Sequence, residues 1–202
     1  RDTVTSAAEG HGPEAAAAVT ALLDADPLRA LPARMPVLGD WADPAALPRI
    51  ALRDGSGVLP LAAAGHLLAM LSISRPGDVY AGLTLAADVL DPAGLAEFGW
   101  AAFARWRTAG MPAKDAWVLD ALGIIGDDET VRRLAPVIRA WPGERAHARA
   151  VAGLDVLAEI GTGVALMHLH GIAQKVKFKG LKDRANEKMA EVAAALELRP
   201  EQ

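Results

Sequence analysis

The chain has no cysteine and few aromatic residues, and both shortages limit what it can be. Without cysteine there is no disulfide bond, no thiolate nucleophile and no cysteine-ligated zinc or iron–sulfur site. The cytoplasm is therefore the expected compartment. Aromatic residues make up only 4% of the 202 residues, whereas alanine and leucine are abundant. Because alanine and leucine lose little on entering a helix, and strands prefer β-branched and aromatic side chains, the composition predicts an all-α protein.

The chain as a whole also lacks an excess of positive charge. Its formal net charge is −4, whereas a protein that coats nucleic acid is usually basic. The charge is unevenly spread, however. Residues 175–188 carry six cationic and two acidic side chains, a net charge of +4, which leaves −8 for the remainder.

One stretch, residues 55–74, lacks charge altogether. Twenty uncharged residues are long enough to span a bilayer. The stretch contains glycines, a proline and His66, however, and its dense apolar part runs only from Val58 to Ile73. We therefore predict a buried core helix and no contact with a membrane.

Proline and glycine divide the chain into three regions. Residues 1–12 read as a polar lead-in without stable structure, and residues 13–57 as an irregular, proline-rich segment with short helices, the first of them starting at Pro13. Residues 58–197 form regular helix pairs, with Gly126 and Gly161 predicted to be left-handed residues that end helices. The helices of this region are expected at 58–73, 77–90, 92–109, 113–125, 128–141, 144–160, 163–176 and 180–197.

These helices repeat at intervals of about 35 residues. Residues 122–126 (LGIIG) return as residues 157–161 (LAEIG), and Trp106 precedes Trp141 by the same interval. Self-similarity at this period, with two helices per unit and short loops, is typical of an α-solenoid. We predict a HEAT-like α-α superhelix of antiparallel helix pairs, forming a single domain over residues 1–202 that is excised from a longer protein. An irregular helical bundle is the alternative.

The polar residues predict no catalytic, cofactor or metal site. His168 and His170 are two residues apart, whereas two metal ligands on one helix face are three or four apart. Asp120 and Asp155 are related by the 35-residue repeat, so we assign them a structural role. No small-molecule substrate is evident either.

The most unusual stretch is the junction between the last two predicted helices. Lysines alternate there with apolar residues around a helix break at Gly180. Lysines and the free N–H groups that begin the last helix favour an anion, and an exposed aromatic ring favours a stacked base. The alternative is a solvated junction with Val176 and the aromatic ring packed in the core. The candidate anion- or partner-binding residues are Lys175, Lys177, Phe178, Lys179 and Lys182.

Three stretches resemble a large bacterial family of unknown function, whose members are often named molybdate metabolism regulators. They are residues 172–182 (IAQKVKFKGLK), residues 138–150, and the segment from Leu47 to Leu71. The resemblance covers roughly residues 30–200. It implies a regulatory role within a long protein, often with an N-terminal WGR module that is associated elsewhere with nucleic-acid-dependent proteins. It implies no catalytic residues, and nothing in the sequence resembles a molybdate site.

Three functions follow as hypotheses. The first is a non-enzymatic scaffold that binds another protein or another domain of its own chain. The second is a nucleic-acid-binding module that uses the lysine-rich segment 175–188. The third is a HEAT-like DNA glycosylase, in which Trp100, Trp106 or Trp117 would act beside Asp120 in a cationic groove.

Overall fold

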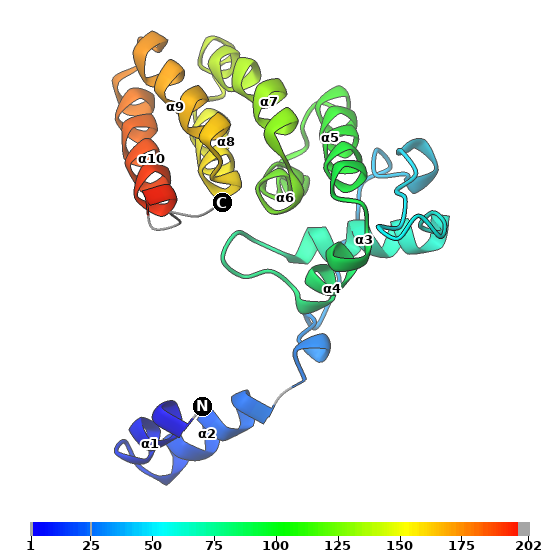
Figure 1. Cartoon of the computed structure of the whole chain (residues 1–202), viewed down its shortest axis with the longest axis vertical. Coiled ribbons are helices and arrows are strands. Elements are labelled where there is room, and N and C mark those ends of the chain that lie inside the picture. Colours follow the sequence, from blue (N-terminus) through cyan, green and yellow to red (C-terminus); the bar gives the residue numbers. More distant parts are fainter. Residues whose placement is uncertain (1, 25, 198–202) are drawn as a thin grey trace.

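The computed structural model describes residues 2–24 and 26–197, and within these ranges the chain folds into α-helices and 3₁₀ turns without a β-strand. Figure 1 shows the arrangement. The α-helices are α1 (Asp2–Glu9), α2 (Pro13–Asp24), α3 (Leu61–Ile73), α4 (Ala81–Val89), α5 (Pro92–Thr108), α6 (Trp117–Ile125), α7 (Asp128–Ala140), α8 (His147–Ile160), α9 (Gly163–Lys175) and α10 (Lys179–Glu197). The 3₁₀ turns are η1 (Pro27–Arg29), η2 (Pro44–Ala46), η3 (Ala113–Asp115) and η4 (Trp141–Glu144). The prediction of an all-α protein is confirmed.

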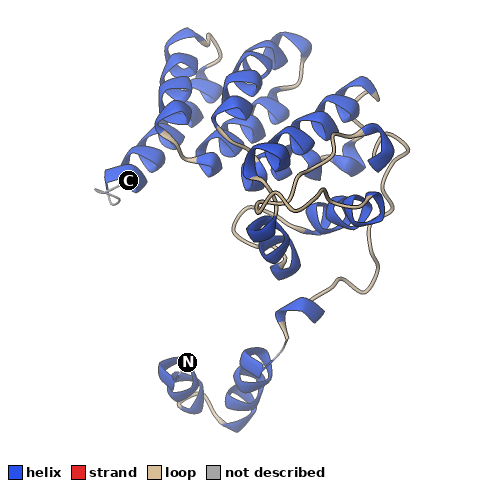
Figure 2. Ribbon diagram, turned by 45° about the vertical axis from the view of Figure 1, so that its right-hand side comes forward, coloured by secondary structure: helices blue, strands red, loops and turns tan. Residues whose placement is uncertain are grey.

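The helices from α5 to α10 form two layers. Helices α6, α8 and α10 lie side by side in one layer, and α5, α7 and α9 in the other. Helices that follow one another also contact across short loops, as α5 and α6, α7 and α8, α8 and α9, and α9 and α10 do, so the two helices of each of these pairs are antiparallel (Figures 1 and 2).

The helix boundaries follow from local chemistry that the sequence displays. Asp91 caps α5 by accepting a hydrogen bond from the Gly94 amide at 2.7 Å, and Pro92 fills the first turn. At the start of α7, Asp127 and Thr130 form a reciprocal capping box. Gly110 and Gly161, with φ of 84° and 64°, adopt the left-handed conformation that ends a helix.

The structure corrects three sequence predictions. Residues 2–9 form the helix α1, which packs on α2, so the first residues are not an unstructured lead-in. Gly126 has φ of −76° and is not left-handed, because the chain leaves α6 in an extended conformation. The helix predicted at 77–90 begins only at Ala81, because the chain first turns between Arg75 and Asp78.

The core is continuous from α3 to α10. Residues separated by 35 positions occupy equivalent places in it: Trp106 and Trp141 are both fully buried, as are Leu122 and Leu157. Leu67 and Leu68 of α3 are also buried, so the uncharged stretch contributes a core helix. Among the described residues, no helix has the length and apolar character needed to cross a membrane.

Candidate functional site

The candidate residues lie in and around a three-residue loop between α9 and α10. We call residues 175–182 the lysine-rich turn. Lys175 is the last residue of α9, Lys177 and Phe178 lie in the loop, and Lys179 and Lys182 lie in the first turn of α10. All five residues are exposed to solvent, and Phe178 is 47% exposed.

Apolar anchors on both sides fix the shape of this turn. Helix α9 ends where the Val176 amide donates to the Ile172 carbonyl at 3.0 Å and Val176 takes an extended conformation. Val176 packs against the core, and Leu181, which is 5% exposed, holds the start of α10 in it. Phe178 lies between the two anchors and is left outside. The alternative in which the ring is buried therefore does not describe Phe178.

The end of the preceding helix pair faces the turn. Arg139 and Ala140 of α7, with Pro142 and Gly143 of η4, line one side of a cleft of about 340 Å³, and residues 175–178 line the other. Trp141 is fully buried and anchors η4. The ring of His147, at the start of α8, lies edge-on to Phe178 with centroids 4.7 Å apart.

The structure divides the cations of segment 175–188 into two groups. Arg184 binds Asp155 at 2.7 Å and Glu187 at 2.9 Å, and Lys188 binds Glu191 at 2.7 Å. The other four cations are the lysines of the lysine-rich turn, and within the described part of the chain no carboxylate lies within 4 Å of their ammonium groups. Only these four remain open to an external anion.

Two arginines of α7 lie near α9, and one of them, Arg132, is paired with Glu129 at 3.4 Å. The pKa of His168, on α9, is lowered first by burial and then by repulsion from Arg139 and Arg132 of α7. Arg132 and Arg139 are seven residues apart and therefore share one face of α7. Arg139 is not among the candidate residues predicted from the sequence. The repeat could have placed Arg139 in the site. Arg139 lies 35 residues before Gln174, and a repeat of this period brings residues at that spacing side by side, here at the end of α9.

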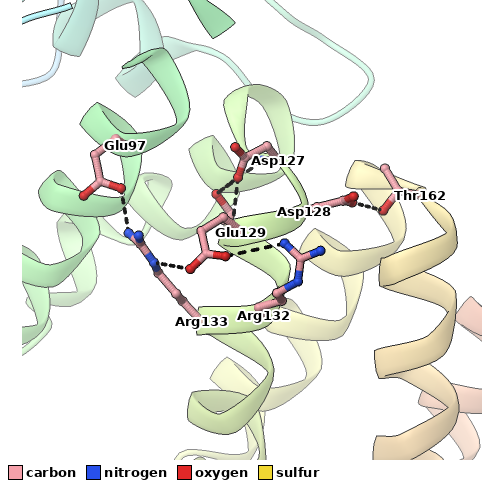
Figure 3. Close-up of polar contacts among 8 residues, drawn as sticks. Glu97, Asp127, Asp128, Glu129, Arg132, Arg133 and Thr162 are labelled. Atoms are coloured by element: carbon pink, nitrogen blue, oxygen red, sulfur yellow. Dashed lines mark hydrogen bonds and ion pairs between the residues drawn. The ribbon is translucent and has the colours of Figure 1, made fainter. Parts of the chain in front are cut away.

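The other polar residues are engaged in structural contacts. Arg133 of α7 binds Glu97 of α5 at 2.6 Å and Glu129 at 3.0 Å, and Thr162 donates to Asp128 at 2.6 Å (Figure 3). The contacts Arg133–Glu97 and Asp128–Thr162 each join helices of adjacent pairs. They stabilise the stacking and leave those side chains little freedom for chemistry.

The two repeated acids lie on neighbouring helices, Asp120 on α6 and Asp155 on α8. Asp155 binds Arg184, whereas Asp120 lies 3.9 Å from Arg75. Burial raises the pKa of Asp120, Arg75 lowers it and Asp155 raises it further.

The remaining candidates stay apart. Trp106 and Trp117 are buried, so neither offers a ring face to a ligand, and Trp100 is half-buried against Phe103 and Arg133. His66 is exposed on α3. Over residues 2–24 and 26–197, no three histidine or acidic side chains are grouped as a metal site would require.

Comparison with known proteins gives one informative match. The chain is 37% identical over 176 residues to an uncharacterized protein of Escherichia coli K12, YehI. The match covers 87% of this chain but 14% of that protein, so the chain spans about a seventh of the length of its relative. No family model and no solved structure matches the chain. The chain is thus similar to part of a much longer bacterial protein whose function is unknown.

Proposed function

We propose that the chain is a HEAT-like α-solenoid scaffold within a longer cytoplasmic protein, and that it binds other proteins or other domains of the same polypeptide without catalysing a reaction. The observation that carries this proposal is the repeated stacking of helix pairs. Two layers, with equivalent tryptophans and leucines buried at 35-residue intervals, are what a solenoid requires. The resemblance to the family named molybdate metabolism regulators, often with a WGR module, fits such a setting.

A surface suited to such contacts lies at the α10 end of the stack. An apolar groove of about 470 Å³ runs between α9 and α10. Met167 lies in it with 62% of its surface exposed, beside Leu166 and Met189. Helix α9 packs on α7, α8 and α10, and α10 packs on α8 and α9; no other described element packs extensively on either helix. Another domain of the longer protein would bury this apolar surface.

Hydrogen exchange on the relative tests the scaffold. The exchange of its matched 176-residue region is measured by mass spectrometry, once alone and once within whole YehI. We expect added protection in the whole protein at the positions equivalent to the α9–α10 groove. Identical exchange throughout the region in both samples would contradict an intramolecular scaffold.

A second candidate is nucleic-acid binding, which is favoured by Arg139, Lys175 and Lys177 on one cleft and by Lys179 and Lys182 in the first turn of the helix that follows. The test is fluorescence anisotropy with labelled duplex and single-stranded DNA at two salt concentrations. Four phosphate contacts predict a slope of log K against log salt of about −3 to −4. Replacing Lys175, Lys177, Lys179 and Lys182 by glutamine should abolish binding. Absence of binding at low salt would exclude this candidate for the isolated chain.

A further inference from the structure

We propose that the cleft between η4 and the lysine-rich turn is a binding site for single-stranded nucleic acid, in which a base stacks on Phe178 while Arg139, Lys175 and Lys177 bind the adjoining phosphates. This inference rests on the second candidate function and adds to it the strandedness of the ligand and the residue that selects it. Nothing in the relative assigns such a site.

Phe178 differs from the other phenylalanines in its exposure to solvent. It is one of three phenylalanines in the chain, and the other two, Phe98 and Phe103, are fully buried. Phe178 instead keeps 47% of its surface exposed between two lysines, with only the edge-on His147 ring as an aromatic neighbour. A large apolar ring gains free energy on burial, so its exposure within a cationic turn leaves it available to a ligand with an apolar face. A nucleobase has such a face and stacks on aromatic side chains.

The charge around the Phe178 ring is mainly positive. Six cationic and two acidic side chains belong to residues 139–145 and 175–183, which form the cleft and the turn. The cations are Arg139, Arg145, Lys175, Lys177, Lys179 and Lys182, and the acids are Glu144 and Asp183. Over the described residues, no ion pair joins any of these eight side chains to another charged group. The cations therefore remain free to bind phosphate groups.

The cleft is small, and its cations come from different elements. Its volume of about 340 Å³ lies at the lower end of the range for small-molecule pockets, about 300–1,000 Å³. That space holds a nucleotide-sized group and is too small for a folded partner. Arg139 comes from α7, Lys175 from α9 and Lys177 from the loop, so the cations reach the cleft from both walls.

An acidic peptide, a nucleic-acid duplex and a single strand differ in the groups that they can offer to the cleft. An acidic peptide matches the charge but supplies no ring to stack on Phe178. A duplex keeps its bases stacked inside the helix, where an exposed side chain does not reach their faces. Single-stranded nucleic acid presents both phosphates and unstacked bases, which is the combination that such sites use.

Anisotropy titrations of the full 202-residue chain test the proposal. The probes are a fluorescein-labelled oligothymidylate, a duplex of the same length and a labelled polyglutamate peptide. Phe178→Ala should weaken binding of the oligothymidylate by about 5-fold or more, since stacking on one base contributes that much, and should leave the salt slope unchanged. Phe178→Trp should restore the affinity. Arg139→Gln and Lys177→Gln should each weaken binding and reduce the salt slope by about 0.7.

Arg49→Gln is the matched control, because it removes one exposed cation that lies before α3 and outside the site. It should change neither affinity nor slope, and circular dichroism should show every variant folded. If Phe178→Ala leaves oligothymidylate binding unchanged while the charge variants weaken it, the stacking site is overturned and nucleic-acid binding by charge alone survives. Equal binding of polyglutamate with the same dependence on Phe178 would identify an acidic protein segment instead. No binding of any probe at low salt would overturn both this site and the second candidate function.

Discussion

At the scale of single residues, the buried contact between Trp41 and Asp115 links the segment before α3 to the turn before α6. The indole N–H of Trp41 donates to a carboxylate oxygen of Asp115 at 2.7 Å, and the two side chains are 7% and 2% exposed. Gly39 completes the contact, because a Cβ atom there would come within 2.8 Å of both partners. The ring centroids of Trp41 and Trp117 also lie 5.7 Å apart.

Removal of this carboxylate should destabilise the chain. We expect Asp115→Ala to lower the free energy of unfolding by about 1.5–3 kcal/mol, because the buried indole N–H loses a charged acceptor. Urea denaturation followed by tryptophan fluorescence measures the change. Asp40→Ala, at an exposed neighbouring position, is the control and should stay within about 0.5 kcal/mol of the wild type. An equal effect of both substitutions would contradict the assigned role.

Asp120 should make stability depend on pH in the direction opposite to that of a salt-bridged carboxylate. Its folded-state pKa is raised, first by burial and also by Asp155, so the native state holds the proton more tightly than the unfolded state. Stability therefore falls as pH rises from 3.8, the ordinary pKa of an aspartate, through the raised pKa of the folded state. Asp120→Asn should lack this decline. The free energy of unfolding of the variant, relative to that of the wild type, should therefore rise as pH increases from 3.8 through the folded-state pKa.

Urea denaturation at several pH values checks the Asp120 prediction. A parallel NMR titration of the carboxyl carbon should give a lower pKa for Asp120 in Asp155→Asn, since one repelling charge is gone. A constant difference between Asp120→Asn and wild type at all pH values would count against the raised pKa.

At the scale of elements, the cap of α9 also joins two helix pairs. The hydroxyl of Thr162 accepts a hydrogen bond from the Ala165 amide at 3.2 Å and donates to Asp128 of α7 at 2.6 Å (Figure 3). We expect Thr162→Ala to lower the free energy of unfolding by about 0.5–2 kcal/mol, because both bonds are lost. Thr162→Ser keeps the hydroxyl and should retain most of the stability. Denaturant titration of both variants decides whether the hydroxyl or the methyl group matters.

Helix α10 begins with charges of the unfavourable sign. Its first turn has no acidic residue, and Lys179 and Lys182 lie at the positive end of the helix dipole. We expect Lys182→Glu to raise the free energy of unfolding by about 0.3–1 kcal/mol while it weakens oligonucleotide binding. Opposite effects on stability and binding would show that the weakened binding does not come from unfolding.

Lys188→Glu makes the matched comparison for the start of α10. The same substitution in the interior of the same helix removes the pairs with Asp155 and Glu191, so it should reduce stability. If both lysine variants change stability in the same direction, the dipole explanation for Lys182 is wrong.

At the scale of the whole molecule, the proposed solenoid predicts stability that varies along the stack. Helices α6 and α8 have neighbours on both sides, whereas among the described elements α10 packs mainly on α8 and α9. The pair α1 and α2 contact mainly each other and lie apart from the stack (Figure 1). Because each repeat interacts with its nearest neighbours, the ends of such an array open more readily than its middle.

Native-state hydrogen exchange measures this variation directly. We expect the slowest amide exchange in α6 and α8, faster exchange in α10 and the fastest in α1 and α2. Uniform protection from α3 to α10, with all amides exchanging through global unfolding, would favour the irregular bundle over the solenoid.

Most of the fold was predictable because its determinants are local. Asp91 with Pro92, Asp127 with Thr130, and Gly161 fix helix ends through hydrogen bonds and dihedral angles within a few residues. The predictions that failed also had local reasons. The sequence around residues 75–80 forms a tight turn before α4, and Gly126 leaves α6 in an extended conformation, which glycine permits as readily as the left-handed one.

The sequence by itself determined the helical class, the 35-residue repeat and the alternation of lysines with apolar residues in the lysine-rich turn. Each of these follows from side-chain types and their spacing along one element. Only the tertiary structure decided which charges stay free, because Asp155 pairs with Arg184, 29 residues away. It also decided that Arg139 joins Phe178 across the cleft and that Trp41 joins Asp115 in the core. Such contacts depend on how whole helices pack against one another, and no local pattern encodes that distance.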